Sequence, residues 1–296
     1  MLKKIFVTII SLILIGLIGL GLIGYYIEYT ESKELEKTKA EEKVEIDNDD
    51  KESEESLVID INKLDISQIP GYTPGEQVIS TNEEDTASND TENNKSNTDQ
   101  TIVGGITLPY NIEEKNMEIV SIGQYSGKFV EDGSDMKKEN VLAMIVKNTS
   151  EEVINYGEIN IKIKSDSGLK KFIITNLKPG SAALVMESTG ETKFNLEDKY
   201  TYVKASCTTE PSLSLMEDIV KVSSKNKQIT IENLSDKDLN TVYVYYRNIS
   251  PGNCYLGGIT YRAKFEDVKA NESLTINTVH LSNTNSEILK VEIVSE

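Results

Sequence analysis

The sequence is poor in the residues on which most catalytic and metal sites depend. Among 296 residues it has no tryptophan, two cysteines and one histidine. A Ser-His-Asp or Cys-His site would have to be assembled around His280, and a His/Cys metal site lacks ligands. The sequence also has no glycine-rich loop for binding phosphates. These absences predict a protein that is not an enzyme and that has no cofactor, no catalytic residues and no metal site.

Two local features of the sequence, His280 and a group of carboxylates around Gly133, could each be functional or merely structural. His280 lies in the segment LTINTVHLS (residues 274–282), whose alternating pattern predicts an ordinary strand residue. Glu131, Asp132 and Asp135 gather around Gly133. Carboxylates at this spacing are ligands that Ca²⁺ takes, but Asp and Gly are also typical of an exposed hairpin turn. The turn is the interpretation that we favour.

The acidic charge is concentrated in one part of the chain. The formal net charge is −18, and residues 28–101 alone hold 22 Asp and Glu against 7 Lys. Residues 102–296 carry 27 acidic and 22 basic residues, so the remainder is only mildly acidic. No basic stripe is present to displace counterions from phosphates, which predicts that nucleic acid is not a partner.

The first 27 residues have the pattern of a membrane anchor. Residues 5–27 are uncharged and follow Lys3 and Lys4. As a helix this run would span roughly 34 Å, enough for a lipid core of about 30 Å. Tyr25 and Tyr26 suit the headgroup boundary. We expect residues 1–4 in the cytoplasm, a retained signal anchor at 5–27 in contact with the bilayer, and the remaining chain outside. The alternative is a cleaved signal peptide, which usually has a shorter apolar region.

Residues 28–101 predict an acidic and mostly disordered linker. It is interrupted by an apolar island, LVIDINKLDISQIPGYTPGEQVI, at residues 57–79. Two interpretations of the island stay open. It either docks on its own domain, which we favour, or acts as a short linear motif that adds a strand to the sheet edge of a partner.

The chain repeats one pattern. VKNTSEEVINYGEINIKI begins at Val146 and TIENLSDKDLNTVYVYYR begins at Thr230, which aligns Asn148 with Asn233. In EINIKI three isoleucines alternate with polar residues, as in a half-buried strand. Several such strands without a helical period predict an all-β fold. We expect two tandem antiparallel immunoglobulin-like β-sandwich domains, at residues 102–209 and 210–296.

The first repeat resembles FxLYD-type and related immunoglobulin-like modules of bacterial envelope proteins. The matching residues are Val146, Asn148, Ser150, Ile159, Ile161, Ile163 and Leu177 to Gly180. The sequence IKSDSG stands where the Leu-Tyr-Asp of the family would be, and the second repeat lacks the Pro and the Gly. The resemblance implies a sandwich fold and a location in the envelope.

The two cysteines, Cys207 and Cys254, lie outside the membrane in the predicted topology. A disulfide would need their Cα atoms within bridging distance, which the sequence does not fix. We favour two unpaired thiols, and the disulfide stays as the alternative.

A candidate binding face emerges from comparing the repeats. Where the first repeat has the outward residues Glu158, Asn160 and Lys162, the second has Tyr243, Tyr245 and Arg247. If residues 241–247 and 257–265 are neighbouring strands, Arg262 and Lys264 stand beside that row. Tyr and Arg are enriched at interface hot spots. The five residues predict a face that binds an envelope protein or an acidic polymer. The alternative is that the tyrosines simply suit an exposed strand or pack against the first repeat. The full list of the candidate face is Tyr243, Tyr245, Arg247, Arg262 and Lys264.

Together these patterns predict a membrane-anchored extracytoplasmic protein of the bacterial cell envelope that binds or scaffolds other molecules. The alternative function is an envelope enzyme with a carboxylate-based site. A deep pocket with two inward carboxylates would favour that alternative.

Overall fold

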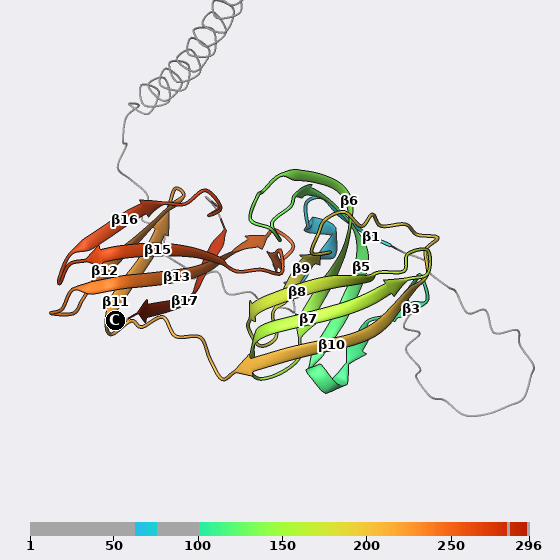
Figure 1. The fold of residues 1–296 in the computed structure, drawn as a ribbon, viewed down its shortest axis with the longest axis horizontal. Helices are drawn as coiled ribbons and strands as arrows, with labels where there is room; N and C mark the ends of the chain where they lie inside the picture. The colour runs from blue at the N-terminus through green and yellow to red at the C-terminus, as the bar shows by residue number, and fades with distance from the viewer. Residues whose placement is uncertain (1–62, 76–100, 283–284, 295–296) are drawn as a thin grey trace, which may run out of the picture. The chain divides into compact units, whose positions relative to one another are not determined.

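The computed structural model describes residues 63–75, 101–282 and 285–294, and this part of the chain is built of β-strands (Figure 1). The helical elements with bounds inside these ranges are two short 3-10 turns, η2 (Ile66–Gln68) and η3 (Glu113–Lys115). The predicted all-β class is therefore confirmed. The predicted anchor at 5–27 and the acidic stretches at 28–62 and 76–100 lie outside the described residues. Within the described ranges, no helix has the length and hydrophobicity to cross a bilayer.

The strands follow one another along the chain with short turns between most of them. In order they are β1 (Tyr72–Pro74), β2 (Thr101–Val103), β3 (Ile106–Leu108), β4 (Tyr110–Ile112), β5 (Met117–Lys128), β6 (Lys137–Asn148), β7 (Val153–Ile163), β8 (Leu169–Leu177), β9 (Ala182–Met186), β10 (Tyr200–Glu210), β11 (Val220–Lys225), β12 (Gln228–Asn233), β13 (Leu239–Ser250), β14 (Cys254–Leu256), β15 (Tyr261–Val268), β16 (Ser273–Asn277) and β17 (Ser286–Val294).

A nine-stranded sheet runs through both repeats. Its order is β1-β5-β6-β9-β14-β13-β15, with β4 beside β5 and β17 beside β13. The junction between the repeats is the parallel pair β9 and β14, in which Ala183 faces Tyr255. Two three-stranded sheets, β10-β7-β8 and β11-β12-β16, and the β2-β3 hairpin complete the described part. The predicted boundary at 209/210 falls at the end of β10.

Apolar side chains form two buried clusters. The first-repeat cluster includes Ile159, Ile161 and Ile163, all at most 3% exposed, as expected for EINIKI. Asn160, which was expected to face outward, is only 4% exposed, and its Nδ2 donates to Glu158 Oε1 (2.7 Å), so the outward side of this strand is not fully exposed. The other cluster combines the second-repeat core with residues from the first repeat, such as Phe129, and with Ile69. Burying one such side chain is worth about 2 kcal/mol. The apolar core is thus continuous from residues near 69 into the second repeat.

The repeated asparagine closes the same loop in each copy. Asn148 is fully buried, and its Oδ1 accepts hydrogen bonds from the backbone N–H (2.9 Å) and hydroxyl (2.7 Å) of Ser150. Its Nδ2 donates to the carbonyls of Glu152 (2.7 Å) and Leu177 (2.9 Å). One side chain therefore satisfies several backbone groups that would otherwise be buried without partners.

The second copy reproduces this arrangement. The Oδ1 of buried Asn233 accepts from the N–H (3.0 Å) and hydroxyl (2.7 Å) of Ser235. Its Nδ2 donates to the carbonyls of Lys237 (2.8 Å), Val268 (3.3 Å) and Lys269 (3.1 Å). The alignment of the two repeats made from the sequence thus corresponds to the same hydrogen-bonding geometry.

Residues 63–75, the described part of the apolar island, form a docked segment on the sheet. β1 pairs antiparallel with β5, with Tyr72 opposite Tyr125. Ile69 and Tyr72 are 2% and 7% exposed, and the Tyr72 hydroxyl lies 2.8 Å from the Ser121 hydroxyl. These residues therefore dock on their own chain, which is the interpretation favoured from the sequence over a motif that adds a strand to the sheet of a partner.

Candidate functional site

The predicted face lies on β13 and its two neighbours. β13 pairs with β15, and the register places Lys264 opposite Tyr243 and Arg262 opposite Tyr245, as expected. The guanidinium carbon of Arg262 lies 4.4 Å from the centre of the Tyr243 ring. Both tyrosines are half-buried, and Arg262 and Lys264 are exposed. Four of the five predicted residues therefore share one surface, which we name the Tyr-Arg face (Tyr243, Tyr245, Arg262 and Lys264).

Carboxylates balance the cations on this face. The Tyr245 hydroxyl donates to Glu292 on β17 (2.9 Å), and burial together with this bond raises the pKa of Tyr245. Lys264 forms an ion pair with Glu266. The Tyr-Arg face thus combines aromatic area with charges of both signs, and it has no strong excess of positive charge.

Arg247 does not belong to the exposed face, which corrects the prediction from the sequence. It is 0% exposed, although alternation along β13 places it on the same side as Tyr243 and Tyr245. At this end of β13, the side of the strand that carries Tyr243, Tyr245 and Arg247 is covered by residues of the first repeat. Arg247 donates from Nη1 to the Thr175 carbonyl (3.1 Å) and from Nη2 to the Gly257 carbonyl. Residue 247 therefore joins the repeats and is not available to a partner.

The buried guanidinium is charged but incompletely bonded. It lies 4.4 Å from the centre of the Tyr255 ring. Burial lowers the pKa of Arg247 to about 10, so it still carries its proton at neutral pH. Among the described residues, its Nε has no hydrogen-bond partner. These contacts define a polar seam between the repeats, formed by Arg247, Thr175, Gly257, Tyr255 and Glu131.

Glu131 brings the opposite charge into this seam. Part of the residue reaches the surface, but its Oε1 accepts hydrogen bonds from the backbone N–H groups of Met186 (2.9 Å) and Gly258 (2.9 Å). Burial of the carboxyl group raises the pKa of Glu131 to about 7, and the backbone donors and Arg247 oppose that rise. Glu131 thus links the first repeat to Gly258 of the second.

Replacing Glu131 by Gln is expected to flatten the pH dependence of stability. Because the pKa of Glu131 rises from its ordinary 4.5 to about 7 on folding, the folded protein binds the extra proton between these values. The free energy of unfolding should therefore fall as pH rises through this range, by about 2 kcal/mol for a partly exposed residue. Chemical denaturation on either side of the range measures this difference. The exposed Glu139→Gln serves as the control, and an unchanged slope in Glu131→Gln would contradict the assignment.

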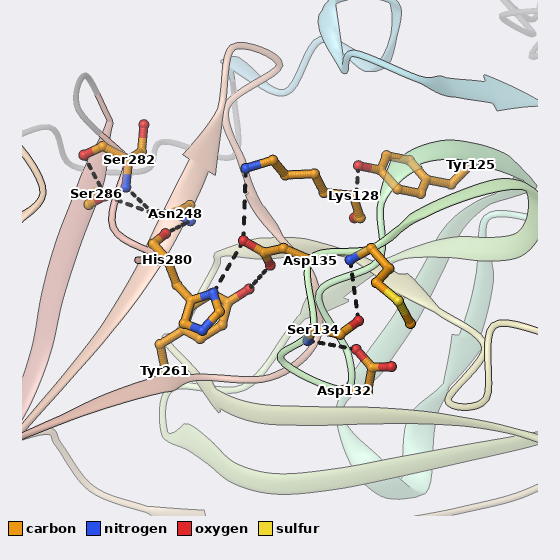
Figure 2. Close-up of polar contacts among 11 residues, drawn as sticks. Tyr125, Lys128, Asp132, Ser134, Asp135, Asn248, Tyr261, His280, Ser282 and Ser286 are labelled. Atoms are coloured by element: carbon orange, nitrogen blue, oxygen red, sulfur yellow. Dashed lines mark hydrogen bonds and ion pairs between the residues drawn. The ribbon is translucent and has the colours of Figure 1, made fainter. Parts of the chain in front are cut away.

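The acidic turn does not gather its carboxylates. Asp132 is exposed and accepts a hydrogen bond from the backbone N–H of Ser134 (2.8 Å), as in a turn, whereas Glu131 points into the seam. Asp135 points toward the second repeat (Figure 2). Across the described ranges, no group of three His, Cys, Asp or Glu side chains is placed to hold a metal ion. The hydrogen bond from Ser134 to Asp132 is that of a turn.

His280 is not a strand residue, because β16 ends at Asn277. Its ring stacks on Tyr261, with centres 4.6 Å apart, and its Nδ1 lies 3.2 Å from Asp135 Oδ2. The Tyr261 hydroxyl donates to Oδ1 of Asp135 (3.2 Å), and Lys128 Nζ lies 3.9 Å from Asp135 Oδ2 (Figure 2). No pattern in the sequence predicts this cluster, since 145 residues separate Asp135 from His280.

The cluster borders a cleft of about 290 Å³. Asp135 is the one carboxylate among the residues that line it. A site with two inward carboxylates, which would favour the enzyme alternative, is therefore not formed in this cleft.

Both cysteines are free thiols. Cys207 is half-buried, and its Sγ lies 3.6 Å from the Lys115 carbonyl oxygen beside the first-repeat core. Cys254 is 0% exposed in the other apolar cluster, and burial raises the pKa of its thiol to about 12. The structure thus has the unpaired thiols that the sequence analysis favoured.

Comparison with models of known protein families gives no match, and comparison with curated proteins gives none either. The resemblance to FxLYD-type modules accordingly stays a prediction from the sequence. Any function must be argued from the geometry of the chain itself.

Proposed function

We propose that this chain is a non-catalytic binding or scaffolding protein of the bacterial cell envelope. Residues 5–27 anchor it in the membrane, and residues 102–296 form two tandem immunoglobulin-like sandwiches outside the cell. The uncharged N-terminal run supports the anchor. The repeated geometry around Asn148 and Asn233 supports the duplication.

The Tyr-Arg face carries the binding part of the proposal. Arg262 stacked on Tyr243 is an ordered pair of the two residue types that dominate interface hot spots. Because the guanidinium is already held against the ring, less side-chain entropy is lost when a partner docks. An exposed sheet surface of this kind suits a folded protein.

The charge balance of the Tyr-Arg face supports one of the two partners considered from the sequence. An acidic polymer needs a surplus of cations, because its affinity comes from displacing counterions. On the Tyr-Arg face, Lys264 is paired with Glu266, and Glu292 lies beside Tyr245. This pattern of both signs favours a protein partner with complementary charges.

Crosslinking in intact cells tests the proposal. The variant Tyr243→Thr/Tyr245→Thr/Arg262→Thr keeps strand-forming residues, and we expect it to capture its partner at least about tenfold less efficiently than the unaltered chain. The matched control is Tyr156→Thr, which removes a tyrosine that is 40% exposed on β7 of the first repeat. Unchanged capture by a folded triple variant would rule out the Tyr-Arg face.

The topology is tested on the same cells. Protease added to wall-stripped, unbroken cells should digest residues 102–296, because the proposal places them outside. Protection of these residues until the cells are lysed would contradict the extracytoplasmic location.

A further inference from the structure

The cleft beside the Asp135–His280 contact lies where three parts of the chain meet. It is lined by Pro70 of the docked segment (residues 63–75), by Lys128 and Asp135 of the first repeat, and by His280 and its neighbours in the second repeat. Ligand sites occur preferentially at such junctions between folded parts. None of the four residues of the Tyr-Arg face lines this cleft, so a ligand here would be additional to a partner of that face.

Part of the cleft wall is apolar. Val130 and Leu281 are each 3% exposed, and the half-buried Leu256 lines the same cleft. Val279 is also a lining residue, and its exposed fraction of 76% is the largest among the large hydrophobic side chains of the described residues. These side chains offer apolar surface that an organic ligand would remove from water.

The charged groups around the cleft are mostly basic, in contrast to the repeats as a whole. Residues 102–296 hold 27 acidic and 22 basic residues. The cleft is lined by Lys128, Lys227 and His280, with Asp135 as the one carboxylate. A concave site lined mainly by one sign of charge attracts ligands of the opposite sign. The cleft therefore favours an anion.

The carboxylate of Asp135 is already bonded, whereas the two lysines can engage a ligand. Asp135 Oδ2 lies 3.2 Å from His280 Nδ1, and its Oδ1 accepts from the Tyr261 hydroxyl (3.2 Å) (Figure 2). Lys128 Nζ is 3.9 Å from the same carboxylate, and its side chain is 64% exposed, so this ion pair is weak. Lys227 is exposed and is not a member of the ion pairs found in the described part of the second repeat.

We infer that this cleft binds a small organic carboxylate with an apolar body. The carboxylate pairs with Lys128 and Lys227, and the body covers Val130 and Val279. The volume of about 290 Å³ equals that of roughly ten water molecules in the liquid. It therefore suits a ligand with on the order of ten non-hydrogen atoms, the lower end of ordinary ligand sites. Free small acids and the carboxyl-terminal residue of a peptide share this chemistry.

His280 provides a direct test, because it is the only histidine of the chain. In the full-length chain, labelled with ¹³C-histidine and purified without a histidine tag, its imidazole gives one ¹H–¹³C signal from the cleft. We expect acetyl-leucine to shift this signal saturably, with a dissociation constant on the order of 1 mM. Acetyl-leucinamide, which lacks the charge, should bind at least about tenfold more weakly.

A short peptide that ends in leucine distinguishes the two sources of the carboxylate. If the peptide with a free carboxyl end shifts the signal and its amidated form does not, the cleft accepts chain ends. If acetyl-leucine shifts the signal and neither peptide does, the ligand is a free small acid. Either result supports the inference.

Two pairs of variants show whether the shift comes from binding in the cleft. Val279→Glu places a negative charge on an exposed lining residue and should weaken binding of acetyl-leucine at least about tenfold. Val203→Glu makes the same change at a valine that is 44% exposed on β10, and it should have no effect. Lys227→Gln should weaken binding about three- to tenfold, and the exposed Lys204→Gln on β10 is its control.

Three results would overturn the inference. The first is an equal shift by the acid and its amide, and the second is no shift by acetyl-leucine or the peptide at about 20 mM. The third is undiminished binding in both Val279→Glu and Lys227→Gln. Because Val279 and Lys227 are exposed, we expect both variants to stay folded, and circular dichroism of the same samples checks this.

Discussion

Arg247→Ala is expected to lower the free energy of unfolding by about 3–5 kcal/mol, because removing one partner of a buried charged cluster leaves the others unpaired. The Gly257 carbonyl would lose the hydrogen bond from Arg247, the Thr175 carbonyl would lose one donor and keep the one from the Thr260 hydroxyl, and Glu131 would lose the cation near its carboxylate. The ring of Tyr255 would also face a cavity in place of the guanidinium. These losses all fall on the seam between the repeats.

The only other arginine of the chain supplies a matched control. Arg262→Ala removes the same side chain from an exposed position, and we expect a cost below about 1 kcal/mol. The loss of unfolding free energy for Arg247→Lys should lie between those of the two Ala variants, since an ammonium group cannot reproduce the planar guanidinium that reaches two carbonyls. Chemical denaturation of the full chain, followed by tyrosine fluorescence and circular dichroism, gives the midpoints. Equal midpoints for the two Ala variants would show that the seam does not stabilise the fold.

Local patterns were sufficient to predict several of the strands and to suggest the pairing behind the candidate face. Alternation placed Ile159 and Ile161 in the core, and the expected neighbours 241–247 and 257–265 pair as β13 and β15. Both predictions depend on side chains close in sequence or on the two-residue period of a strand. The equivalence of Asn148 and Asn233 was also visible, because each lies at the same distance before its serine.

Contacts between distant segments could not be predicted in this way. Alternation correctly placed Arg247 on one side of β13, but nothing local shows that the first repeat covers that end of the row. The parallel pair β9 and β14 and the contact between Asp135 and His280 likewise join residues far apart in sequence. Such contacts depend on how sheets pack, which a single sequence does not encode in a local pattern.

Asn148→Ala and Asn233→Ala are each expected to cost about 2–4 kcal/mol of folding free energy, and to cost nearly the same. In each copy one side chain bonds both the backbone of the serine and a buried carbonyl, and alanine would remove that partner from each of these backbone groups. Because the two sites share their geometry, similar losses are the energetic consequence of the repeat. Asn155→Ala on β7, where the asparagine is exposed, is the control and should change stability by less than about 0.5 kcal/mol. Denaturation midpoints compare the three variants. If Asn148→Ala lowered the free energy of unfolding as little as Asn155→Ala does, the buried amide would not be what stabilises the loop. If only one of Asn148→Ala and Asn233→Ala lowered it, the shared geometry would not give the two copies the same energetic contribution.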